Sequence, residues 1–128
     1  MFAITSIYAG LLAILFVTLS VRVILHRRRA KALIGDCGDK ALFHAIRVHG
    51  NFIEYTPYAV LLIALSEAQG APGWAVHLLG IMLVGGRLLH VWGFGRDPQI
   101  LVLRQIGMLS TFAVLILTGL GLIFHALV

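Results

Sequence analysis

The sequence predicts an all-α protein, an integral membrane bundle of four helices, and three observations support this fold class. Of the 128 residues, 60% are hydrophobic and only 12% are charged, whereas a soluble domain usually carries about 25% charged residues. The apolar residues form four segments, each near the roughly 20 residues with which a helix crosses a bilayer. All ten lysines and arginines lie in or beside two of the three connections between these segments.

The four segments are predicted as helices at about residues 2–25, 41–68, 74–93 and 100–127. An open sheet would leave backbone groups unpaired in lipid, and the segments lack the two-residue alternation of a barrel strand. The first segment is too long for a signal-peptide core, so we expect it to be retained as a span. Gly70, Pro72 and Gly73 predict a turn between the second and third helices. We expect a single domain, 1–128, whose apolar surface needs lipid or partner subunits to cover it.

The positive charges predict how the chain is oriented. Seven of the ten lysines and arginines lie between residues 22 and 47, and the other three lie between 87 and 104. By the positive-inside rule, loops 26–40 and 94–100 are expected in the cytoplasm and both termini on the opposite side. The net charge of +5 does not predict nucleic-acid binding, because the basic residues occupy short loops between apolar runs. Cys37 is the only cysteine, and no role is expected for it.

Polar side chains share one side of the second predicted helix. At about 100° per residue, roughly a quarter of its circumference holds His44, Arg47, Asn51, Glu54, Tyr55 and Tyr58. Such a strip can bind a zwitterionic ligand, because arginine holds a carboxylate, glutamate accepts from an ammonium and asparagine does both. Alternatively, Arg47, Asn51 and Glu54 can pair with one another and hold helices together. Pro57 is expected to kink this helix and to open space beside the strip.

The third and fourth segments add further candidates. Arg87 and His90 share one face of the third segment, where they can contact a ligand. Alternatively, Arg87 extends to the cytoplasmic surface and His90 is a packing residue. Arg104 opens the fourth segment, and the spacing of Gly107 and Thr111 allows a neighbouring helix to approach closely, which would bury Arg104. There Arg104 can stabilise a ligand thiolate as nucleophile, or it can simply extend to the surface. No metal site is predicted.

A resemblance to a known family lies in the stretch RVHGNFIEYTPY, from Arg47 to Tyr58. It is similar to the Arg-x3-Asn-x2-Glu-Tyr-x-Pro signature in the second helix of the MAPEG family, the membrane-associated proteins in eicosanoid and glutathione metabolism. Length, four spans, a basic first loop and an arginine opening the last helix also agree. The resemblance implies a homotrimer that holds glutathione, as a co-substrate, at subunit interfaces near the cytoplasmic side. The implied glutathione contacts are Arg47, Asn51, Glu54 and Tyr55.

By the same resemblance, Arg104 corresponds to the arginine that family transferases use on the glutathione sulfur. The leading hypothesis is a glutathione-dependent transferase or peroxidase that acts on lipophilic electrophiles, with Arg104 as catalytic residue. Arg87 and His90 are added to the predicted glutathione contacts, although conjugating family members usually have tyrosines where this chain has His90, Trp92 and Phe94. The alternatives are a non-catalytic trimer that binds lipid or glutathione, and a purely structural bundle. The compact chain most resembles small bacterial members, so a bacterial inner membrane and contact with its lipids are expected.

Overall fold

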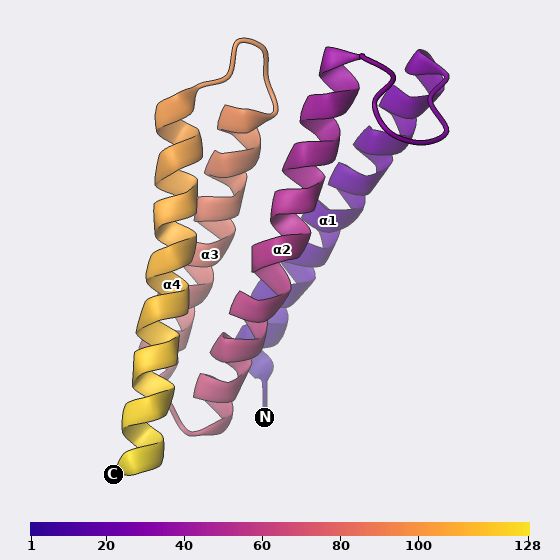
Figure 1. Cartoon of the computed structure of the whole chain (residues 1–128). Helices are drawn as coiled ribbons and strands as arrows, with labels where there is room; N and C mark the ends of the chain where they lie inside the picture. The colour runs from indigo at the N-terminus through magenta and orange to yellow at the C-terminus, as the bar shows by residue number, and fades with distance from the viewer.

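The computed structural model describes residues 1–128 and contains four α-helices and no strand. They are α1 (Ala3–Ala30), α2 (Lys40–Ala68), α3 (Gly73–Phe94) and α4 (Leu101–Leu127). The helices run alternately up and down, and the α1–α2 and α3–α4 connections lie at one end of the bundle (Figure 1). Both termini and the α2–α3 turn lie at the other end. The predicted all-α bundle is therefore confirmed.

Three of the helices, α1, α3 and α4, are long and apolar enough to cross a membrane. The polar strip lowers the hydropathy of α2, but this helix has 29 residues, about 44 Å at the usual helical rise. Because α1 ends and α3 begins at opposite ends of the bundle (Figure 1), α2 must cross with them. Only 22 of the 128 residues are buried, and large apolar side chains on every helix are exposed. Lipid therefore contacts the outer faces.

The first helix differs from its predicted boundary. It continues to Ala30 rather than ending near residue 25, and its last turn contains Arg27, Arg28 and Arg29. Arginine is a good helix former, and cations near a helix C-terminus interact favourably with the helix dipole. The apolar run ends near residue 25, and the basic turn that continues the helix is suited to the headgroup region of a bilayer. It stops at Lys31, whose φ of 52° is left-handed.

Two carboxylates hold the helix starts. At α2, the Asp39 side chain accepts a hydrogen bond of 2.8 Å from the Leu42 amide. At α1, the Glu67 carboxylate from the far end of α2 accepts from the Ile4 amide at 3.0 Å and from the Thr5 amide at 2.8 Å. The Thr5 hydroxyl donates to the same carboxylate at 2.5 Å. This contact satisfies amides that have no partner within α1, and it ties the start of α1 to the end of α2.

Glycines set the closest helix contacts. A Cβ on Gly107 of α4 would lie 2.4 Å from the carbonyl oxygen of Gly86 on α3 and 2.7 Å from the His90 amide nitrogen. The predicted close approach at Gly107 is thus confirmed, with α3 as the neighbour. At the start of α4, a Cβ on Gly93 would lie 2.6 Å from the Arg104 amide nitrogen. At both glycines the absence of a side chain allows the backbones of α3 and α4 to lie close together. The approach at Gly93 places Arg104 beside the end of α3.

Candidate functional site

The structure divides the polar strip of α2 between the inside and the outside of the bundle. Asn51 and Tyr55 are half-buried, and the Tyr55 ring packs edge-on against Phe112 of α4 with centroids 5.6 Å apart. Arg47 and Glu54 are exposed on the outer surface. The strip covers roughly a quarter of the helix, so its two edges meet different surroundings.

The exposed members of the strip remain without a charged partner in the chain. The only ion pair joins Lys40 to Asp97, so neither Arg47 nor Glu54 has one. The hypothesis that Arg47, Asn51 and Glu54 pair with one another is therefore wrong within the subunit. Glu54 is the central residue of α2, which begins at Lys40 and ends at Ala68. A carboxylate thus lies exposed on the outside of a membrane-crossing helix, at its midpoint.

Arg87 is the buried cation of the bundle. Its side chain is 1% exposed, so the interpretation that it extends to the cytoplasmic surface is wrong. One guanidinium nitrogen, Nη1, donates to Oδ1 of Asn51 at 2.7 Å, and Nη2 donates to the sulfur of Met108 at 3.2 Å. The third nitrogen, Nε, is buried without a partner. Arg87 thus joins α2, α3 and α4 through two neutral acceptors, and no carboxylate contacts it.

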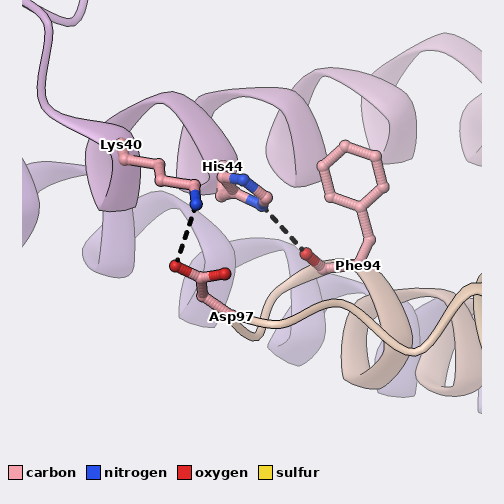
Figure 2. Close-up of polar contacts among 4 residues, drawn as sticks. All are labelled: Lys40, His44, Phe94 and Asp97. Carbon is pink, nitrogen blue, oxygen red and sulfur yellow. Dashed lines mark hydrogen bonds and ion pairs between the residues drawn. The ribbon is translucent and has the colours of Figure 1, made fainter.

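Side chains of α2, α3 and α4 meet around the ring of Phe94, at the end of α3. The His90 ring stacks on it with centroids 5.6 Å apart, and His90 is itself only 2% exposed. The His44 ring lies 5.7 Å from it, and His44 Nδ1 is 3.3 Å from the Phe94 carbonyl oxygen (Figure 2). The Arg104 guanidinium lies 4.0 Å above the ring centre. Aromatic faces attract cations, so this ring holds Arg104 in place.

Arg104 is half-buried rather than enclosed between helices as expected. Its Nη1 donates to Oε1 of Gln99 at 3.1 Å, in the connection that precedes α4. The close contact at Gly107 lies almost one turn further along α4, so it does not enclose the arginine side chain. Arg104 therefore sits at the rim of the bundle, held by a neutral amide and an aromatic face.

The arginines at this end of the bundle have no anionic partner in the chain. Asp36 and Asp39 lie in the first connection, Asp97 pairs with Lys40, and Glu67 caps α1 at the opposite end. The fifth acidic residue, Glu54, makes no ion pair. Arg47, Arg87 and Arg104 consequently create a positive potential that an incoming anion can neutralise.

Sequence reasoning named the arginines but missed two groups that hold them. Phe94 follows His90 by four residues, so helical spacing alone could have placed the two rings together. Met108 gave no signal, because a methionine in an apolar helix is ordinarily a packing residue.

The predicted kink at Pro57 does not interrupt α2. An apolar groove of about 450 Å³ beside Pro57 opens toward α1, and no residue of the strip lines it.

Comparison with known proteins identifies the family of this chain. The pattern of the MAPEG family matches residues 5–124. The inner membrane protein YecN of Escherichia coli strain K12 is 37% identical over 122 residues, which cover 95% of this chain and 92% of YecN. YecN of E. coli O6:H1, strain CFT073, matches equally. No solved structure matches the chain significantly. The predicted inner-membrane location is confirmed by these relatives and by the three apolar spans. Because the family pattern covers residues 5–124 and YecN is similar over nearly the whole chain, the protein belongs to the MAPEG family.

Proposed function

We propose that the protein is a glutathione-dependent transferase that conjugates lipophilic electrophiles in the membrane and works as a homotrimer. The MAPEG family includes glutathione transferases as well as non-catalytic members. The observation that supports the proposal most strongly is the exposed carboxylate of Glu54 at the midpoint of α2, with Arg47 about two turns nearer the basic end. Unpaired charges at this position are costly in lipid, so a neighbouring subunit and a polar ligand would together cover them.

Glutathione has the charges that this face of α2 lacks. It carries two carboxylates and one ammonium group, so Arg47 can hold a carboxylate and Glu54 can accept from the ammonium. Asn51 lies between them, and Arg87 already occupies its amide oxygen. The amide nitrogen of Asn51 is therefore the group left to donate to a ligand. In this proposal Arg87 acts as a positioning residue, because it fixes the orientation of Asn51 from inside the bundle.

Arg104 would hold the reacting sulfur. Its guanidinium contacts only the neutral Gln99 amide and the Phe94 ring, so its charge is available to stabilise a thiolate. The thiol proton leaves to solvent, and the sulfur attacks the electrophilic carbon of the acceptor. With a chloronitrobenzene acceptor, a carbon–sulfur bond forms and chloride departs with the carbon–chlorine electron pair. Because the acceptor is lipophilic, it can arrive from the bilayer that surrounds the exposed apolar faces.

The test is the conjugation of glutathione to 1-chloro-2,4-dinitrobenzene by purified protein in detergent. Arg104→Ala should lower kcat by about 100-fold, since loss of one transition-state donor has this effect elsewhere, and should change the Kd for glutathione little. Arg47→Ala should instead weaken glutathione binding by about 10-fold or more, because it removes a charge-assisted contact. Arg29→Ala is the matched control, since Arg29 lies in the last turn of α1 outside the site, and its kinetics should equal those of wild type.

Other outcomes separate the alternatives. Stabilisation of the protein by glutathione without any turnover above the uncatalysed rate would indicate a non-catalytic binding trimer. Absence of both turnover and thermal shift would indicate a structural bundle, in which Glu54→Gln should still change the stability of the oligomer. Lipid hydroperoxides form the second substrate class to assay, since the same thiolate can attack the peroxide bond and a second glutathione can complete the reduction.

A further inference from the structure

A small basic hollow lies at the end of the bundle that carries the loops, apart from the residues assigned to glutathione. Its volume is about 160 Å³, and it lies between α1, the start of α2 and the α3–α4 connection. The side chains that line it are Arg22, Lys40, Ala41, His44, Arg96 and Asp97. None of the arginines in the proposed glutathione site belongs to it.

The side chains of this basic hollow are predominantly cationic. Arg22 comes from α1, Lys40 from α2 and Arg96 from the α3–α4 connection, against a single carboxylate. Figure 2 shows the ion pair between Lys40 and Asp97. Lys40 Nζ lies 3.3 Å from Asp97 Oδ2, but the two side chains are 72% and 62% exposed. Exposed pairs of this kind contribute little stability, so the lysine can exchange its partner readily. Two positive charges are left in excess.

Each of the two arginines that line the hollow is held by a contact with a neutral group. A guanidinium nitrogen of Arg22 donates to the carbonyl oxygen of Gly95. The Arg96 guanidinium lies 4.7 Å above the ring of Trp92. Neither contact is with an anion, so both guanidinium groups keep donors available for one.

The start of α2 adds donors at the same place. The Asp39 side chain accepts from the Leu42 amide, and the Asp39 carbonyl accepts from the Phe43 amide. The amides of Lys40 and Ala41 precede these, and the first amides of a helix have no acceptor within it. Both residues line the hollow. The positive end of the helix dipole therefore reinforces the three cationic side chains.

The surroundings of the hollow favour a lipid as the source of the anion. Trp92, under Arg96, is 61% exposed, and Leu25, which follows Arg22 by three residues on the same side of α1, is 48% exposed. Exposed tryptophan in a membrane protein is typical of the headgroup region. Apolar outer faces of the helices continue from there into the hydrocarbon. We propose that the basic hollow binds the phosphate of an anionic phospholipid, whose acyl chains run along those outer faces.

The test measures the binding of short-chain lipids to the purified full-length protein in neutral detergent, by thermal shift and by native mass spectrometry. Dihexanoyl phosphatidylglycerol should raise the Tm and remain bound to the protein, whereas dihexanoyl phosphatidylcholine should do neither. Arg96→Gln should weaken binding about fivefold, the effect expected of one basic residue near an anionic lipid. Asp97→Asn should strengthen binding by a similar factor, because it removes the competing carboxylate.

A matched control separates this site from general charge attraction. Arg29→Gln removes the same charge from the neighbouring last turn of α1 but does not line the hollow, so it should leave the affinity unchanged. Equal loss in Arg29→Gln and Arg96→Gln would overturn the proposal, as would equal binding of the two lipids. A shift of the same size with inorganic phosphate alone would overturn the lipid as the source and assign the hollow to free phosphate. Glutathione conjugation by the Arg96→Gln variant reports on the proposed glutathione site, so its result neither supports nor contradicts lipid binding in the basic hollow.

Discussion

The contact between Arg87 and Asn51 connects the interior of the bundle to the polar face of α2. A guanidinium that is 1% exposed, with two neutral acceptors and no carboxylate, is an unusual arrangement for a buried charge. Burial of this charge without a carboxylate costs stability in the subunit, and its contact with Asn51 offsets part of that cost. In the proposed function the same contact orients Asn51, so Arg87 would affect both ligand binding and the stability of the bundle.

The first prediction concerns this contact. Asn51→Leu should lower the free energy of unfolding by about 3 kcal/mol, because it removes the oxygen acceptor of a buried cation. The double variant Asn51→Leu/Arg87→Leu should recover most of this loss, since no charge then remains buried. The measurement is chemical unfolding in detergent without glutathione. Strictly additive effects of the two single variants would contradict the proposed coupling.

At the scale of elements, the start of α1 depends on a carboxylate from another helix. Glu67→Gln should destabilise the bundle by about 1 kcal/mol, because it removes the negative charge that faces the amides of Ile4 and Thr5. Hydrogen exchange should accelerate in the first turn of α1 while the middle of α2 stays protected. Gln69→Ala is the control: it lies two residues after Glu67, just beyond the end of α2, and its side chain makes no hydrogen bond to the α1 amides, so it should leave the exchange unchanged.

The crossing of α3 and α4 gives a sharper prediction. Gly107→Ala should destabilise the protein by about 2 kcal/mol or more, since its Cβ would lie 2.4 Å from the Gly86 carbonyl oxygen, which is backbone and cannot rotate away. Gly119→Ala on the same helix meets nothing within 4 Å, so it should be neutral or slightly stabilising. Thermal unfolding of both variants checks this. Equal stabilities would mean that α3 and α4 do not approach as closely as the structure indicates.

At the scale of the whole molecule, the bundle has one strongly basic end, where both long connections lie (Figure 1). Cys37 is exposed in the first connection and is the only cysteine, so it serves as a natural label for the side on which this end lies. A maleimide reagent that cannot cross membranes should label it in inside-out vesicles but not in intact spheroplasts, because the positive-inside rule places this loop in the cytoplasm.

The reciprocal variant completes the topology test. Cys37→Ser combined with Gly70→Cys moves the thiol to the α2–α3 turn at the opposite end, and labelling should then occur only in intact spheroplasts. Labelling of both variants from the same side would contradict a four-span topology. The basic hollow and the proposed glutathione site would lie on the cytoplasmic side under the same orientation, where glutathione is available.

The sequence alone determined the number of helices, their approximate bounds and the end at which the charges gather. These follow from the bilayer, which requires about 20 apolar residues per span and internally satisfied backbone groups, whatever the packing. It also identified the strip from His44 to Tyr58 and the arginines of α3 and α4. The extension of α1 to Ala30 was not predictable from hydropathy, because the last turn of the helix consists mainly of arginines rather than apolar residues.

Contacts between the helices set which way each polar side chain faces, and the sequence did not reveal them. Helical periodicity places Arg47, Asn51 and Glu54 on one side of α2, but the seam with α3 falls at the edge of that side, so Asn51 turns inward and its neighbours outward. Likewise, the sequence left Arg87 free to reach the surface, and the acceptors of Asn51 and Met108 keep it inside. Which face of a helix is buried depends on contacts with helices far apart in the chain, and the sequence pattern of one helix does not specify those contacts.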